Sequence, residues 1–150
     1  MTVKIDYILN ANLARASELL RSGLFEDCQR LCQENVWLFQ SIAEPSGRQI
    51  AAFSESQALC GECAFLAGDF AAARTRYRKA VHLAPRESAY WQRLAQSCAR
   101  LYMNTGDVRF DSESAAAARN VFLLQKKAGT AALHTGKSGN ENAINHRVCS

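Results

Sequence analysis

The sequence predicts an all-α protein built from antiparallel helix pairs. Its apolar residues recur at spacings of three and four, which is the period of a helix with one buried face. Alternation at the period of a strand is scarce, and the Asn-Gly and Asp-Gly pairs typical of hairpins are absent. Short segments with glycine or proline separate the periodic stretches, and short turns between helices place neighbours antiparallel. About six helices are expected.

The first helix pair is expected over residues 6–21 and 25–39. Ser22-Gly23 separates the two helices, because glycine readily takes the left-handed conformation that ends a helix. Pro45-Ser46-Gly47 then interrupts the chain. The apolar face of the first helix consists of Ile8, Leu13, Ala16, Leu19 and Leu20, and that of the second of Phe25, Cys28, Leu31, Cys32, Val36 and Leu38.

The second pair is expected over residues 49–67 and 70–84. Gly68-Asp69 forms the turn between these two helices, and Asp69 is placed to cap the second one. Pro85 ends this pair, because the residue before a proline disfavours the helical conformation.

The third pair is expected over residues 87–103 and 113–128, with a loop over 104–112. Glu113 would lie in the first turn of the last helix, where a negative charge suits the helix dipole. We expect that helix to bury Val121, Phe122 and Leu124. From Gly129 onward the apolar periodicity ends in Gly, Ser, Thr and Asn, so residues 129–150 are expected to form a flexible, disordered tail beside a folded domain at 1–128.

Composition sets the general class of the protein. Its 150 residues match one domain, and 48% apolar with 21% charged residues exclude wholesale disorder. The sequence has no apolar run long enough to cross a membrane and no apparent secretory signal, so an intracellular location, cytoplasmic or nuclear, is expected. In that reducing setting the six cysteines are expected to be thiols.

The central pair carries the most specific pattern in the chain. A glycine turn, a small residue, an aromatic residue, another small residue and a closing proline follow at fixed spacing, and Trp-x-x-Leu-Ala comes next. This pattern resembles the tetratricopeptide repeat, a helix-turn-helix unit of about 34 residues. The resemblance implies a superhelical array of helix pairs. The residues that carry it are Gly61, Gly68, Phe70, Ala73, Tyr77, Ala80, Pro85, Trp91, Leu94 and Ala95.

Weaker copies of the pattern flank the central unit. Upstream lie Ala16, Leu19, Gly23, Phe25 and Cys28, and downstream Ala118 and Phe122 repeat the spacing of Ala73 and Tyr77. The small residues Cys28, Ala73 and Ala118 recur every 45 residues, which is longer than the family's unit and predicts insertions near 41–52 and 104–112.

A second resemblance covers residues 15–81. The order Ser22-Gly-Leu-Phe25, Leu38-Phe39 and Gly68-Asp-Phe70 is similar in spacing to the N-terminal domain of the anaphase-promoting complex subunit seven family. The resemblance implies a non-catalytic structural role in a ubiquitin ligase of the cell cycle, and a self-associating N-terminal domain.

The tetratricopeptide register implies a concave groove lined by the first helix of each pair. Such a groove suits a peptide or a partner helix. Glu55 and Glu62 would repel a carboxylate, so a receptor for chaperone C-termini is not expected. The predicted groove residues are Asn10, Leu13, Ser17, Leu20, Glu55, Ala58, Glu62, Phe65, Gln92, Gln96 and Ala99.

Candidate chemical motifs have simpler explanations. Cys60-x-x-Cys63 and Cys28-x-x-x-Cys32 have a spacing used for zinc or redox chemistry, but both pairs fall within helices where small apolar residues are needed. The stretch from Ala131 to Gly136-Lys137-Ser138 loosely matches a phosphate loop without its first glycine or a preceding strand. His82, His134 and His146 have no matching catalytic partners. No cofactor, metal or catalytic residue is therefore expected.

The sequence thus predicts a non-catalytic scaffold for protein–protein interactions. The last expected helix lacks a polar capping helix, which suggests that a partner covers it or that the array is longer, and predicts a homodimer. The alternative is a domain that binds an acidic surface or nucleic acid through Arg74, Arg76, Arg78 and Lys79. No membrane partner is expected.

Overall fold

The computed structural model describes the backbone of residues 2–148 and the side chains of residues 4–130. Within the described backbone there are six helices and no strand, so the predicted all-α class is confirmed. The helices are α1 (Thr2–Arg21), α2 (Phe25–Gln40), α3 (Gly47–Leu66), α4 (Phe70–Leu83), α5 (Ser88–Thr105) and α6 (Val108–Val148).

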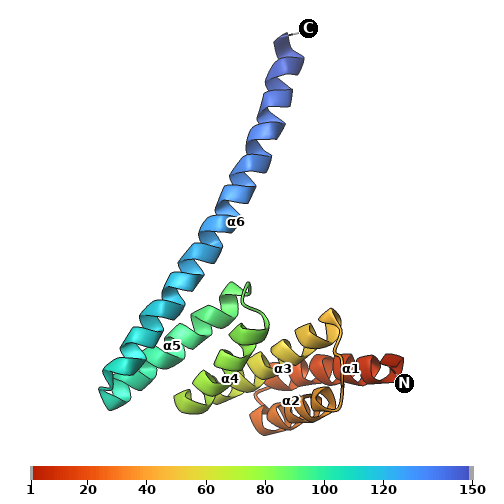
Figure 1. Ribbon diagram of the computed structural model, residues 1–150, viewed down its shortest axis with the longest axis vertical. Coiled ribbons are helices and arrows are strands. Elements are labelled where there is room, and N and C mark those ends of the chain that lie inside the picture. The colour runs from red at the N-terminus through yellow and green to blue at the C-terminus, as the bar shows by residue number, and fades with distance from the viewer. Residues whose placement is uncertain (1, 149–150) are drawn as a thin grey trace.

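The helices are arranged in chain order along the molecule (Figure 1). Each helix packs against the next one in the sequence, and α1 also packs against α3. Short turns join the helices, so the chain forms the consecutive pairs α1/α2, α3/α4 and α5/α6. Interior residues lie between successive helices rather than in one central core, in clusters that link α1 to α3 and α3 to α6.

Both helices of the central pair, α3 and α4, have a side-chain cap at their first turn. The Ser46 hydroxyl accepts a hydrogen bond from the backbone N–H of Gln49, and the Gln49 side chain accepts one from the N–H of Ser46. Asp69 caps α4 as predicted, because its carboxylate accepts a hydrogen bond from the N–H of Ala72 at 3.1 Å.

Helices α3 and α4 approach each other closely at Gly61. A Cβ atom added to Gly61 would lie 2.8 Å from Cε2 of Tyr77, so only glycine leaves room for that ring. Ala73 and Ala80, on the same face of α4 as Tyr77, are both 0% exposed. Gly68 ends α3 with a φ of +82°, the left-handed conformation of a helix C-terminus.

The other residues of the predicted repeat pattern join α3 and α4 to α5. The rings of Phe65 and Phe70 meet edge to face at 5.2 Å. The indole N–H of Trp91 donates to the Pro85 carbonyl at 2.7 Å. Leu94 is buried in the cluster that links α3 to α6, and Ala95 is partly buried against it.

The third helix pair differs from its predicted register by one residue. Ala118 is exposed, and Phe122, which we expected to be buried, has 63% of its surface exposed. Ala117 is buried instead, and Val121 is partly buried. In a run of four alanines the sequence offers no large side chain that would distinguish one register from the next.

The start of α6 also corrects the prediction. The expected loop over 104–112 consists only of Gly106 and Asp107, and the helix begins at Val108 rather than 113. The Asp107 carboxylate accepts a hydrogen bond from the N–H of Arg109 at 3.0 Å, which satisfies a free donor at the helix start.

The backbone of α6 extends past its expected end near residue 128. The helix continues to Val148 and leads away from the other five helices (Figure 1). That residues 129–150 form a flexible tail beside a folded domain at 1–128 stays a prediction. The side chains of His134, Lys137 and His146, and with them the phosphate-loop pattern, lie outside the described residues.

Deletion of residues 131–150 is expected to leave the melting temperature within about 2 °C of the wild type. The side chains of residues 125–130 are all exposed, so the described packing of α6 lies before the deleted segment. Deletion of residues 121–150 removes the partly buried Val121 and Leu124 and is expected to lower the melting temperature by about 5 °C or more. Thermal unfolding followed by circular dichroism measures the melting temperature of both deletion variants. Equal decreases in melting temperature would contradict the conclusion that the packing of α6 ends near Leu124.

Candidate functional site

The predicted groove residues fall into three groups. Asn10, Glu55, Gln92 and Gln96 are exposed, and Ser17, Leu20, Glu62, Phe65 and Ala99 are partly buried. Leu13 and Ala58 are buried. Leu13 packs with Leu9 and Ala52 between α1 and α3, so it does not face solvent as predicted. The tetratricopeptide register assigns Leu13 to the groove, but the additional contact between α1 and α3 covers it.

Glu62 and Phe65 take part in interactions within the fold. The Glu62 carboxylate accepts hydrogen bonds from the Tyr77 hydroxyl at 2.7 Å and from Nε of Arg93 at 2.8 Å. The Arg93 guanidinium lies 4.2 Å from the centre of the Phe65 ring. Burial and the neighbouring Glu62 carboxylate raise the pKa of Tyr77 above its ordinary value. This network ties α3 to both α4 and α5.

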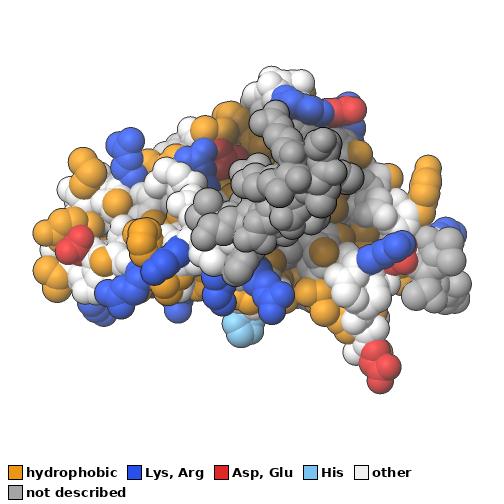
Figure 2. Space-filling model, turned by 90° about the horizontal axis from the view of Figure 1, so that it is seen from above, with side chains coloured by type: hydrophobic (Ala, Val, Ile, Leu, Met, Phe, Trp, Pro, Cys, Tyr) orange, Lys and Arg blue, Asp and Glu red, His pale blue; other side chains and the backbone are white. Residues whose placement is uncertain are grey.

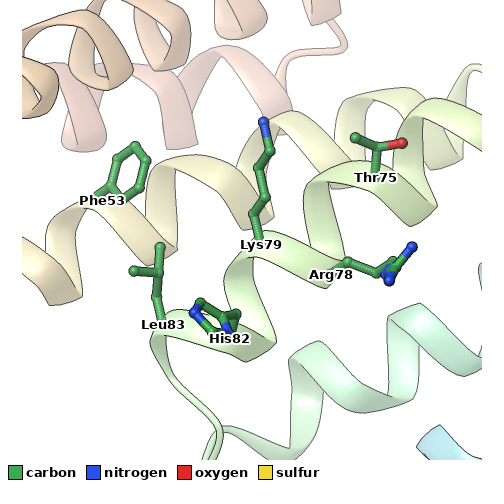
Figure 3. Close-up of a pocket in the computed structure, with 6 residues that line it drawn as sticks. All are labelled: Phe53, Thr75, Arg78, Lys79, His82 and Leu83. Carbon is green, nitrogen blue, oxygen red and sulfur yellow. The ribbon is translucent and has the colours of Figure 1, made fainter.

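A pocket of about 490 Å³ lies between α3 and α4, and none of the predicted groove residues lines it. Phe53 of α3 and Leu83 of α4 form its apolar wall (Figure 3). The Phe39 ring of α2 stacks on Phe53 at 4.1 Å between ring centres, which holds that wall in place. We call this site the basic pocket; it is lined by Phe53, Thr75, Arg78, Lys79, His82 and Leu83.

A second pocket of about 420 Å³ lies on the other side of α4, between α4, α5 and α6. It shares Arg78 and His82 with the basic pocket, and its walls include Val81, Trp91 and Leu94. The exposed ridge of α4 therefore separates two neighbouring pockets, each with apolar side chains beside basic ones.

The four basic residues of α4 that the alternative prediction uses, Arg74, Arg76, Arg78 and Lys79, have different surroundings. Arg74 forms an ion pair with Glu113 at 2.7 Å, and Arg76 donates to the side chains of Gln57 and Gln33 at 3.0 and 2.9 Å. These two cations are engaged within the fold.

The other two of these basic residues, Arg78 and Lys79, are exposed to solvent. Arg78 is 3.5 Å from Glu113, but its side chain is 58% exposed. Lys79 is exposed, and none of the ion pairs between described side chains includes it. Figure 2 shows Lys and Arg side chains on both sides of a histidine at this edge of the molecule. His82 is the histidine whose side chain the structure describes, and it is exposed.

An acidic pocket of about 310 Å³ lies on the other side of Leu83. Glu55, a predicted groove residue, lines it together with Glu87 and Tyr90. Burial raises the pKa of Tyr90, and the charges of Glu55 and Glu87 add to that effect. The surface around α4 thus carries pockets of opposite charge.

The two cysteine pairs meet in one buried cluster between α2 and α3. Cys28, Cys32, Cys60 and Cys63 are at most 3% exposed and are free thiols. Burial is the main cause that raises the pKa of Cys63 and Cys28, and a hydrogen bond to Cys60 is the main cause for Cys32. Among residues with described side chains, no group of three or more His, Cys, Asp or Glu is arranged to hold a metal ion. The spacing does not reveal that the pairs meet, because the contact depends on how α2 packs on α3.

The described thiols are expected to resist modification in the folded protein. In a Cys149→Ser variant, Cys28, Cys32, Cys60, Cys63 and Cys98 should react with Ellman's reagent at pH 8 only after guanidinium unfolds the chain. All five are buried, so the reagent does not reach them. Burial raises the pKa of Cys98 to about 11, whereas the hydrogen bond with Cys32 lowers the pKa of Cys60, so burial alone protects Cys60. Absorbance at 412 nm follows the reaction. Rapid reaction of any of the five before unfolding would instead favour the redox interpretation.

The comparisons with known proteins give no family. No protein-family model matches the chain. A search of curated proteins finds no match. Within the described residues, no helix combines the length and the apolar character needed to cross a membrane.

Proposed function

We propose that this protein is a non-catalytic scaffold for protein–protein interactions, built from tetratricopeptide-like helix pairs. The observation that supports it best is the close approach at Gly61, where the Tyr77 ring fills the space that a side chain would need. The tetratricopeptide pattern places a small residue and an aromatic residue in this relation, and Ala73 and Ala80 are buried beside them.

The stacking of the pairs explains why such a chain would act as a scaffold. Each helix pair buries its apolar face against the next pair, so the array extends in one direction and leaves long surfaces open. In this chain those surfaces contain pockets of opposite charge on either side of Leu83. Surfaces of that kind bind other proteins, and the polar network of Glu62, Tyr77 and Arg93 serves the packing of the helices.

Affinity purification with quantitative mass spectrometry tests this proposal, using the full chain as bait. The matched baits are the wild type, Ala71→Glu at an exposed position and Ala73→Glu at a buried position of the same helix. Proteins that need the folded array should purify with the first two baits and be depleted with the third. If no protein is enriched on the wild type over Ala73→Glu, the scaffold function is wrong.

The narrower proposal is a structural subunit of the anaphase-promoting complex ubiquitin ligase. It rests on the spacing of residues 15–81, and the same purification tests it. Subunits of that ligase among the enriched proteins would support it, and enrichment of an unrelated set alone would contradict it.

Self-association is part of the proposal. Phe122 and Leu123 of α6 are 63% and 48% exposed, and a second copy that covers them would remove this apolar surface from water. Light scattering at high micromolar concentration should then give a dimer, and Phe122→Glu should restore the monomer. A wild-type monomer at that concentration would contradict self-association.

The alternative is an acidic-surface or nucleic-acid binder that uses the basic residues of α4. Arg78, Lys79 and His82 support it, because they lie together at the basic pocket. The engagement of Arg74 and Arg76 leaves a short basic surface, whereas nucleic-acid binding gains its affinity from many phosphate contacts. An acidic protein surface fits this arrangement better.

A further inference from the structure

We infer that the basic pocket docks an acidic peptide segment that inserts one large apolar side chain between Phe53 and Leu83. The inference rests on the proposed scaffold function and specifies the chemistry of one partner and the surface that receives it. Two features of the pocket support it, its apolar wall and its charge.

The apolar wall is suited to hold an anchoring side chain. Phe53 and Leu83 come from different helices and face a space of about 490 Å³, large enough for a leucine or phenylalanine side chain with adjoining backbone (Figure 3). The stacking of Phe39 on Phe53 limits the movement of the ring, so binding would cost little ordering of the wall.

The positive charge around the basic pocket favours acidic residues next to the anchoring side chain in the peptide. Arg78, Lys79 and His82 line the pocket, and none of its lining residues is acidic. Glu113 on α6 lies 3.5 Å from Arg78 and partly offsets its charge, but Glu113 also pairs with Arg74. Lys79 is therefore the main unbalanced cation, and carboxylates beside the apolar anchor would complete the pair.

The adjoining pocket on α4 favours an extended segment over a single side chain. Arg78 and His82 line both pockets, so a peptide that crosses the ridge of α4 passes these two residues and reaches a second apolar surface at Trp91 and Leu94. Glu113 also lines this second pocket, so the part of the peptide that enters it is apolar rather than acidic. A nucleic-acid strand would need a longer series of free cations, and α4 uses two of its arginines within the fold.

Fluorescence anisotropy with defined peptides tests the inference on the full chain. The probe is a labelled peptide in which Glu and Asp residues flank a Leu-Phe pair. One comparison peptide replaces Leu and Phe by Ser, and another replaces Glu and Asp by Lys. We expect the probe to bind with a Kd of about 10–100 µM at low salt, and to bind more weakly as salt rises. Both comparison peptides should bind at least about tenfold more weakly.

Paired variants locate the binding surface. Lys79→Glu with His82→Glu should weaken probe binding at least about tenfold. Lys126→Glu with Lys127→Glu, at exposed positions of α6, changes the net charge by a larger amount and should leave the affinity within about twofold. Circular dichroism confirms that both variants are folded. In NMR spectra the Phe53 ring and Leu83 methyl signals should shift on titration, a result that general electrostatic attraction does not produce.

Three results would overturn the inference. The two double variants could lose probe binding to the same extent, a comparison peptide could bind as tightly as the probe, or the probe could fail to bind at millimolar concentration. If single-stranded poly-U displaces the probe at a lower concentration than the unlabelled probe peptide does, the pocket would be assigned to nucleic acid instead. The scaffold function fails separately, when no protein distinguishes the wild-type bait from Ala73→Glu. If partners remain bound to the Lys79→Glu, His82→Glu bait, the scaffold stands and the pocket assignment falls.

Discussion

Ala73→Glu is expected to unfold the protein. The side chain of Ala73 is 0% exposed, on the face of α4 that packs against α3 beside Tyr77 and Ala80. Glutamate there would overfill a close helix contact and bury a carboxylate, which together should cost at least about 4 kcal/mol. Domains of this size have a total free energy of unfolding of about 5–15 kcal/mol. Urea unfolding followed by circular dichroism should show a transition at much lower urea, or none.

Ala71→Glu is the matched control for that substitution. Ala71 lies in the first turn of α4 and is exposed, so the new carboxylate stays in water and lies near the positive end of the helix dipole. The unfolding free energy of the Ala71→Glu variant should stay within about 0.5 kcal/mol of the wild-type value. A wild-type transition for Ala73→Glu would show that α3 and α4 do not pack as described.

Asn35→Asp is expected to cost about 2–4 kcal/mol at pH 7. Asn35 is 0% exposed at the junction of α1, α2 and α3. Its amide nitrogen donates to the Leu9 carbonyl and the Ser56 hydroxyl at 3.1 Å each, and its oxygen accepts from Asn12 at 2.9 Å. Aspartate has nearly the same shape but no donor when ionised, so a negative oxygen would face the Leu9 carbonyl.

The cost of Asn35→Asp should depend on pH in a defined direction. Burial raises the pKa of the introduced carboxyl in the folded state above its value of about 4 in the unfolded chain. The folded state then binds a proton that the unfolded state has lost, so stability falls as the pH rises from about 4 toward the raised pKa. Unfolding experiments at pH 4.5 and pH 7 should give the smaller loss at pH 4.5. Asn104→Asp, at an exposed position of α5, provides the control, and a pH-independent loss would contradict this explanation.

The sequence was most informative where packing requires one kind of residue. Glycine at 61 and alanine at 73 and 80 leave few alternatives to a close helix pair, and the structure places all three in the interior between neighbouring helices. Apolar periodicity identified six helices for a related reason, since each helix must bury one face. The Asp69 cap was predictable because a capping side chain acts on the backbone three residues away.

Features that depend on the relation between distant elements were not predictable. The run Ala115–Ala118 allows several registers, so the assignment of Ala118 and Phe122 was displaced by one residue. The basic pocket joins Phe53 of α3 to α4, and the engagement of Arg74 requires Glu113 from α6. Asn35 offered no signal, because its partners on α1 and α3 lie more than 20 residues away in sequence.

The length of α6 gives the molecule a reach that the other helices lack. With 41 residues at a rise of 1.5 Å each, the helix extends about 60 Å, and its part beyond Leu124 spans roughly 35 Å. The distal turns of α6 are therefore held far from α4 and from the pockets on either side of it.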